Sequence, residues 1–502
     1  MTSKFRKCSK NILRNNVATA HDLEMALQRA ETDAPKETFD AFPETPMPLQ
    51  APRFLKGMPR VGQVYNPQEK ITKELAAIID ANYYTENFVA AIQTVAEQKI
   101  AEISRIKTLD QFYFYVDTLS TWMPEIRVWD WDGQIYHERT VYLRLTQFYY
   151  YFNQPSLEAL QSPIEPGDNT LSPISKWLRE FAISWGSFLD TPESARYLES
   201  FKYAPEYTWQ EYKKAPEDYN NFNEFFARTF KDIEVQRPVA RPSDDRVIAF
   251  PAESTFVGQW AISTKVGSPL PAPPSIVVKN IQWSIGELLA DSQFGDEFEG
   301  GIFCHSFLNS FDYHRQHAPV SGKILEAKFI PGQVYLEVNL TTEKRANASL
   351  DDNYEPAYTH SVKPNRYLDA EDGTGYQFVQ CRGLIIIDNP VIGKVAVLPM
   401  GMAQVSSVVF VHPKTHQPIA LSPEEQKHAS YEEQVALLNA KIRQELVGKH
   451  LDKGEMMSYF QFGGSDIVMA FQREACVDIT AQIGIHYPIR SQYAVANGEV
   501  KR

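Results

Sequence analysis

The chain has 502 residues, of which 43% are hydrophobic and 23% are charged, and these ordinary fractions exclude a wholly disordered, collagenous or coiled-coil protein. Its 50 basic and 63 acidic residues give a net charge of −13, the wrong sign for a protein that grips nucleic-acid phosphates. No apolar run approaches the roughly 18 residues of a membrane-spanning helix. We therefore expect no nucleic-acid partner and no stable membrane insertion.

The four cysteines, Cys8, Cys304, Cys381 and Cys476, are scattered and form no C-x-x-C pair. This spacing argues against a zinc site or a disulfide scaffold, and it favours a reducing, cytoplasmic setting. Five of the first fourteen residues are Lys or Arg, which leaves a mitochondrial presequence as the alternative. A basic tail is the commoner meaning of so short a run.

Seven prolines between Asp33 and Pro67 are too many for a helix or a central strand. Residues 1–67 are therefore predicted to be a basic tail followed by an extended, proline-rich arm. The pattern then turns helical, because apolar residues such as Ile71, Leu75 and Ile78 recur at spacings of three and four. Residues 68–221 are predicted to form an α-helical domain, and the many Trp and Tyr residues near its end are interpreted as packing core.

Short β-rich runs separated by Pro and Gly begin after residue 222. The clearest runs are 247–250, 323–330, 384–387 and 395–398. The predicted fold class is therefore α+β, with the helical domain followed by a mostly β domain over 222–502. Two segments that interrupt the β pattern, 267–274 and 341–375, are predicted to be surface loops, and a lid over a pocket is an equally weighted interpretation of the second.

Residues 459–471 read YFQFGGSDIVMAF, an apolar alternation followed by Gly463-Gly464 and a second apolar run. Taken alone, this pattern predicts a β-hairpin, because Gly-Gly is an ordinary turn signal. The sharper hypothesis is that the hydroxyl of Ser465 attacks the carbonyl carbon of Gly464 and cleaves the chain there. Such an attack needs a base for the hydroxyl proton and a group that orients the base.

The densest group of histidines lies in the segment FLNSFDYHRQHAP, which contains His314 and His317. A tight metal site needs a third or fourth ligand, and none is evident, so no metal is predicted. His412 and His416 have the spacing of a metalloprotease motif but lack its Glu and lie among prolines, which predicts a surface loop. Considered alone, His314 and His317 are expected more often as buried structural residues than as catalysts.

The motifs of other common enzyme classes are missing from the sequence. It contains no G-x-x-x-x-G-K-[ST] or G-x-G-x-x-G phosphate-binding loop and no G-x-S-x-G nucleophile elbow. The Ser465 turn and the histidine pair therefore remain as the candidate chemistry.

Several segments, in chain order, resemble the pyruvoyl-dependent phosphatidylserine decarboxylase family. They are FNEFFARTF (222–230) with RPV (237–239), AFPAEST (249–255), DYHRQHAPVSGKI (312–324) and KGEMMSYFQFGGS (453–465). Two further segments, WGSFLDTPES (185–194) and DDNYEPAY (351–358), resemble one branch in particular, the soluble tryptophan decarboxylases of psilocybin biosynthesis. Four blocks in the family's order make a chance resemblance very improbable.

This resemblance implies a proenzyme that cuts itself between Gly464 and Ser465. The serine remnant would become a covalent pyruvoyl group, a self-made cofactor that acts as an electron sink, and the large and small chains would stay associated. In the matching positions, His317 would be the base that activates Ser465, and His314 would help with protonation during decarboxylation. The resemblance leaves the oligomeric state open.

Two residues depart from the family's usual pattern. Glu253 stands where the family usually has the Asp of a charge relay, and a longer carboxylate is still able to orient His317. Asp466 follows the cleavage serine where Thr or Ser is common, and the sequence predicts neither a faster nor a slower cleavage from it.

The leading hypothesis is a pyruvoyl-dependent carboxy-lyase that converts an aromatic L-amino acid, such as tryptophan, into its amine and carbon dioxide. The alternative is decarboxylation of phosphatidylserine to phosphatidylethanolamine. The net negative charge of the chain argues against it, because anionic lipid surfaces attract basic proteins. A catalytically inactive binding protein is the third possibility. The presence of Glu253, His317 and Ser465 argues against it.

Overall fold

The computed structural model describes residues 53–498, apart from 101, 132–133, 168–169, 265–273, 279–280, 291, 342–366, 371–374, 403–407, 428 and 463. The basic tail and most of the proline-rich arm therefore lie outside the described residues. So do nearly all of the predicted loop 267–274 and most of the candidate lid 341–375.

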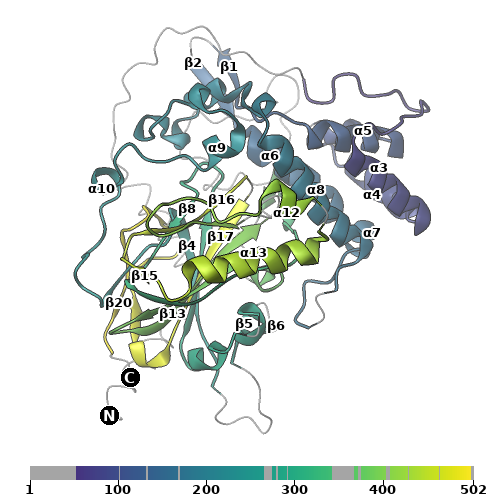
Figure 1. Ribbon diagram of the computed structural model, residues 1–502. Coiled ribbons are helices and arrows are strands. Elements are labelled where there is room, and N and C mark those ends of the chain that lie inside the picture. The colour runs from purple at the N-terminus through teal and green to yellow at the C-terminus, as the bar shows by residue number, and fades with distance from the viewer. Residues whose placement is uncertain are drawn as a thin grey trace.

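Helices of 12 to 17 residues dominate the first part of the structure, as predicted (Figure 1). They are α3 (Lys70–Ala81), α4 (Thr85–Glu97), α5 (Leu109–Ser120), α6 (Thr140–Phe152) and α8 (Pro173–Leu189). Each turns an apolar stripe inward, and the rings of Phe148 and Phe181 stack with their centroids 4.5 Å apart. The Ser172 side chain caps α8 by accepting from the Ser175 amide. The many aromatic residues are therefore packing core.

Shorter elements complete this region, and one of them was not predicted. A β-hairpin of β1 (Arg127–Trp131) and β2 (Gln134–Glu138) interrupts the helices. The short helices are α7 (Pro155–Glu158), α9 (Phe222–Phe226) and α10 (Ile233–Gln236). The 3₁₀ turns are η1 (Ile103–Arg105), η2 (Pro192–Ala195), η3 (Leu198–Tyr203), η4 (Pro205–Tyr207), η5 (Trp209–Glu211) and η6 (Pro216–Asp218). Among the described residues, no helix is both long and apolar enough to cross a membrane.

An eight-stranded antiparallel sheet forms the centre of the second part. In spatial order its strands are β15 (His450–Leu451), β9 (Gly322–Ile330), β12 (Arg382–Asn389), β13 (Gly393–Met402), β17 (Gly464–Phe471), β7 (Ile302–Leu308), β4 (Ser254–Ala261) and β19 (His486–Tyr487). The predicted runs 323–330, 384–387 and 395–398 all lie in this sheet. The α+β fold class is therefore confirmed.

Smaller sheets and helices surround the large sheet (Figure 1). The strands are β14 (Val408–Phe410), β16 (Met456–Phe460) and β8 (Arg315–His317) in one sheet, β18 (Val477–Ile479), β20 (Gln492–Ala496) and β3 (Val247–Ala249) in another, and the hairpins β5 (Ser275–Val278) with β6 (Ile281–Ser284) and β10 (Val338–Thr341) with β11 (Tyr367–Ala370). The helices are α11 (Ile285–Leu288), α12 (Pro423–Gln426) and α13 (Tyr431–Leu446), with the turns η7 (Gly295–Phe298), η9 (Tyr376–Phe378) and η10 (Arg473–Ala475). Helix α13 is fixed to β9 by Asn439, whose amide bonds both the N–H and the carbonyl of Phe329.

The prediction of a hairpin over 459–471 is wrong. Strand β16 pairs with β14 and β8, whereas β17 lies between β13 and β7 in the large sheet. The physical reason is the apolar run from Ile467 to Phe471, in which every side chain is at most 2% exposed. A strand that is buried on both faces needs a neighbour on each side and cover above and below, which a hairpin alone does not supply.

Candidate active site

Ser465 is the second residue of β17 and lies in the interior of the large sheet. It is paired with Gly401 of β13 on one side and with Leu308 of β7 on the other. The residue is fully buried, and its Oγ has no hydrogen-bond partner among the described residues. A buried hydroxyl without a hydrogen-bond partner costs free energy, so it calls for an explanation. A role in a chemical reaction is one such explanation. The setting fits a serine that is consumed to make a buried group.

The chain just before the scissile bond is fastened to the helical part of the structure. The Phe462 amide donates to Oδ1 of Asn223 over 3.1 Å. The Phe462 ring packs against Trp185, Phe222 and Phe226, with centroid distances of 5.3, 5.2 and 5.5 Å. Two helices, α8 and α9, thus hold the segment that leads into the cleavage site.

His314 lies beside this aromatic cluster. Its ring stacks on Phe226 with the centroids 3.8 Å apart, and its carbonyl accepts from the Phe460 amide over 2.9 Å. Neither ring nitrogen has a hydrogen-bond partner of good geometry among the described residues. Burial, together with the positive charge of Arg228, holds the pKa of His314 well below the usual value of 6.5, and the backbone of Asp312 only partly offsets this. The ring is therefore neutral.

His317 is held in one tautomer by the backbone. Its Nδ1 lies 2.7 Å from the carbonyl oxygen of Gly454, which only accepts, so Nδ1 carries the proton. The other nitrogen, Nε2, is then the acceptor, and the Tyr313 hydroxyl lies 3.3 Å from it. Burial lowers the pKa of His317 to about 3, an effect that the Gly454 contact partly opposes. His317 is therefore a neutral base with its lone pair on Nε2.

The Glu253 carboxylate is paired with Arg237 and not with His317. Its two carboxylate oxygens accept from Nε and Nη2 of Arg237 over 2.9 and 3.0 Å. Among the described residues, no hydrogen bond joins Glu253 to His317, although the His317 amide donates to the carbonyl of Pro251, two residues earlier, over 2.8 Å. The carboxylate and the imidazole thus share one region, and the Gly454 carbonyl performs the tautomer-fixing task that we expected of Glu253.

Asp466 sits in a buried polar cluster that the sequence did not reveal. One of its carboxylate oxygens lies 3.1 Å from Nε2 of His305 on β7, and the other accepts from Nε2 of Gln377 in η9 over 3.0 Å. Side chains alternate along a strand, and His305 is directly opposite Val468, so Asp466 and His305 share a face. Such a diagonal pair is predictable only once the register is known. Gln377, which is distant in sequence, left no signal.

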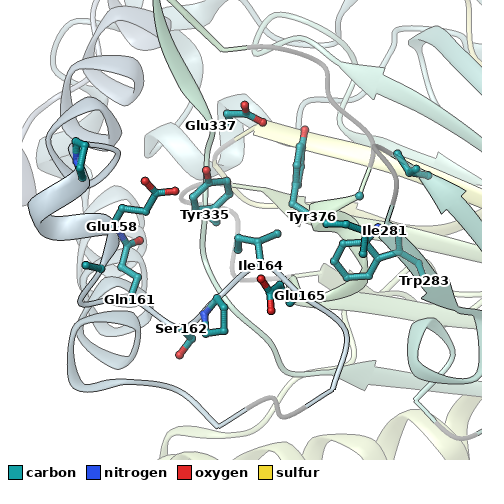
Figure 2. Close-up of a pocket in the computed structure, with 15 residues that line it drawn as sticks. Glu158, Gln161, Ser162, Ile164, Glu165, Ile281, Trp283, Tyr335, Glu337 and Tyr376 are labelled. Carbon is teal, nitrogen blue, oxygen red and sulfur yellow. The ribbon is translucent and has the colours of Figure 1, made fainter.

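A cavity of about 660 Å³ lies next to η9 (Figure 2). Figure 2 shows Tyr335 and Tyr376 on the two sides of Ile164, and the lining includes the carboxylates of Glu158, Glu165 and Glu337. Tyr376 precedes the glutamine that bonds Asp466. The wall of this acidic, partly aromatic cavity therefore lies one residue from the glutamine that donates to Asp466.

His412 and His416 form a tight turn, as predicted. The His416 amide donates to the His412 carbonyl over 2.8 Å, and Lys449 donates to Nε2 of His412 over 2.7 Å. His416 is exposed. Within the described part of the chain, no three His, Cys, Asp or Glu side chains come together in a way that would hold a metal ion.

The two buried, neutral histidines predict how stability changes with pH. Unfolded His314 and His317 take up protons below about pH 6.5, whereas the folded protein resists this until a much lower pH. Their contribution to the free energy of unfolding is therefore lost as the pH falls below 6.5, by up to about 1.4 kcal/mol per pH unit for each. In the uncleaved Ser465→Ala protein, the free energy of urea unfolding measured at pH 7.0, 6.0 and 5.0 should fall less steeply with falling pH when His317→Gln is added. The exposed His450 is the control, and an unchanged slope in His317→Gln would contradict the assignment.

Comparison with known proteins agrees with this geometry. The family model described as phosphatidylserine decarboxylase matches residues 222–491, more than half of the chain. A phosphatidylserine decarboxylase proenzyme of Fusobacterium nucleatum is 26% identical over 302 residues, which cover 60% of this chain and 76% of that protein. A proenzyme of the same name from Saccharophagus degradans is 37% identical over 134 residues, which are 26% of this chain and 42% of the relative.

An L-tryptophan decarboxylase of Psilocybe cubensis is also similar, with 24% identity over 263 residues. The match covers 52% of this chain and 48% of the relative, so the chain spans about half the length of that protein. Identities of 24% and 26% do not separate the two kinds of relative, and the resemblance to the tryptophan branch is thus confirmed only as membership of the wider family. The chain belongs to the phosphatidylserine decarboxylase family, whose proenzymes cut themselves to make a pyruvoyl group.

Proposed function

We propose that this chain is a self-processing decarboxylase that converts an aromatic L-amino acid, such as tryptophan, into its amine and carbon dioxide. The observation that carries the proposal is the setting of Ser465, a fully buried hydroxyl directly after a glycine, at the start of a central strand in a chain of this family. Chain cleavage gives that hydroxyl a use.

Cleavage begins when Oγ of Ser465 attacks the carbonyl carbon of Gly464, and the bond from that carbon to the Ser465 nitrogen breaks as an ester forms. Loss of the Ser465 Cα proton then expels the Gly464 carboxylate, and water hydrolyses the remnant with release of ammonia. The products are a large chain of residues 1–464 and a small chain, 465–502, that begins with the pyruvoyl group.

His317 is the proposed base for the hydroxyl proton of Ser465. Its neutral state and the Gly454 contact place the lone pair on Nε2, which is 3.3 Å from the Tyr313 hydroxyl and forms no hydrogen bond to Ser465 among the described residues before the reaction begins. Glu253 is proposed to stabilise the imidazolium that results. It acts from the ion pair with Arg237, because no hydrogen bond joins it to the ring among the described residues.

Once formed, the pyruvoyl group supplies a conjugated carbonyl that accepts the electrons released as carbon dioxide leaves. The proposed task of His314 is to deliver a proton to the product. A neutral imidazole carries one N–H, and the ring is held by stacking on Phe226 rather than by hydrogen bonds to its nitrogens. Both ring nitrogens therefore stay available for proton transfer.

The acidic cavity beside η9 supports an amino acid over a phospholipid as the substrate. The cavity that leads to η9 carries Glu158, Glu165 and Glu337. Carboxylates repel the phosphate of phosphatidylserine and attract an ammonium group.

Phosphatidylserine is the second candidate, because the Fusobacterium relative that bears this name is matched over 76% of its length. A panel of tryptophan, tyrosine, phenylalanine and phosphatidylserine vesicles, with carbon dioxide release as the readout, separates the two. We expect release from at least one free aromatic amino acid, and no effect of added pyridoxal phosphate. If carbon dioxide were released from phosphatidylserine vesicles and from none of the three amino acids, phosphatidylserine would replace the aromatic amino acid as the substrate.

A further inference from the structure

The buried cluster of Asp466, His305 and Gln377 lies one residue away from the proposed cofactor, yet none of the steps above uses it. All three side chains are completely buried. Three contacts connect them: Asp466 to His305 at 3.1 Å, Asp466 to Gln377 at 3.0 Å, and Gln377 to His305 at 3.3 Å. A buried carboxylate is expensive unless it is paired and hydrogen-bonded, so a cluster of this kind has to be explained.

The cluster lies on the opposite face of the sheet from the Ser465 hydroxyl. Along β17, Ile467, Met469 and Phe471 pack into one hydrophobic core, and Val468 and Ala470 pack into another. By the same alternation Ser465 shares a face with Ile467, and Asp466 shares a face with Val468. The Asp466 carboxylate therefore points away from the attacking hydroxyl and is not its base.

Cleavage changes what holds this end of the strand. Before cleavage, position 465 is fixed by the covalent chain that precedes it and by its pairing with Gly401 and Leu308. After cleavage the covalent tether is gone, and a pyruvoyl group has no N–H to donate to the ladder. New chain ends fray unless other contacts hold them. Asp466 is then the first residue of the small chain whose side chain is able to hold the end in place.

We infer that Asp466, held by His305 of β7 and Gln377 of η9, is a positioning residue that fixes the pyruvoyl end of the small chain. This inference rests on the proposed function. The carboxylate joins β17 to its neighbour strand and to the wall of the acidic cavity at once, so the end of β17 cannot shift relative to either. Asp is suitable here because one carboxylate oxygen accepts from Gln377 while the other lies 3.1 Å from Nε2 of His305.

The test compares His305→Ala, which removes the imidazole, with His305→Gln, which puts a polar amide in a similar place. Asp466→Thr is a third variant that retains volume in case His305→Ala fails to fold. The exposed histidine of the His450–Asp452 pair, 63% exposed, supplies the matched control His450→Ala. Each protein is examined by intact mass, phenylhydrazine labelling of the small-chain carbonyl, hydrogen exchange of the amides at 466–468, and kcat and KM with the substrate that the wild type accepts.

We expect all four variants to be cleaved and to carry the carbonyl. His305→Ala and Asp466→Thr should show faster exchange at 466–468 and a kcat lower by about 10²-fold, the loss typical of a reacting group misplaced by about 1 Å, with KM little changed. His305→Gln should recover most of the kcat, and His450→Ala should match the wild type.

The inference would be overturned if His305→Ala and Asp466→Thr both showed the same hydrogen exchange and the same kcat as the wild type. The proposed function would remain intact. Folded variants that remain uncleaved would also overturn the inference, because the cluster would then serve processing and not the position of the product. A wild-type protein that is itself uncleaved and unlabelled by phenylhydrazine would instead overturn the proposed function, and this inference with it.

Discussion

Ser465→Ala should yield one uncut chain of 502 residues that neither reacts with phenylhydrazine nor releases carbon dioxide. The wild type should instead give the chains 1–464 and 465–502. The loss is complete because the Oγ of Ser465 is both the attacking atom and the leaving oxygen of the elimination, so no other group supplies the cofactor. Intact-mass measurement distinguishes the outcomes directly.

The matched control is Ser491→Ala. Ser491 also lies in the small chain, its hydroxyl donates to the carbonyl of Pro488 within its own turn, and its loss should not affect cleavage. Active, purified wild-type protein that runs only as a full-length chain with an unmodified Ser465 would disprove the mechanism. Cleavage that persists in Ser465→Ala would place the scissile bond elsewhere.

His314→Ala should be cleaved normally but should decarboxylate about 10² to 10⁴ times more slowly, the range expected when a positioned proton donor is removed. The neutral ring stacks on Phe226, and among the described residues its nitrogens have no hydrogen-bond partner of good geometry. Since His317 remains with its Gly454 contact, processing should continue. Mass spectrometry measures the cleavage, and carbon dioxide release measures the rate.

A cleaved and fully active His314→Ala protein would remove His314 from the reaction. An uncleaved one would move it from decarboxylation into processing. His317→Ala is the informative companion, because we expect that chain to remain uncut. The pair of variants therefore separates the two steps even before the substrate is known.

The sequence predicted the classes of element better than their partners. The three-and-four spacing of Ile71, Leu75 and Ile78 was sufficient for the helix α3, because a helix is a local structure. The run 467–471 predicted a strand correctly but not its neighbours. Its pairing with β13 and β7 depends on segments some 70 and 160 residues away, and propensity carries no information about such contacts.

The candidate site shows the same division. Ser465, His314 and His317 are predicted as site residues from motifs, and the structure buries all three. The partners of those residues were not predictable, because a carbonyl such as that of Gly454 has no signature in a sequence. The partner of Glu253 was not predictable either. Arg237 and His317 are both able to pair with its carboxylate, and only the folded geometry shows that Arg237 does so.

Because β16 and β17 lie in different sheets, the proposed cleavage would leave the two new chain ends in separate parts of the fold. Once the bond between Gly464 and Ser465 is cut, residues 465–502 still supply the central strand β17 and the strands β18, β19 and β20. The two chains then hold together through packing and ladder hydrogen bonds alone. After unfolding, the short chain would have to find its place between β13 and β7 by diffusion, so recovery would depend on concentration and compete with aggregation. We therefore expect the cleaved protein to owe its stability to slow unfolding, whereas the uncut proenzyme should refold as a single chain.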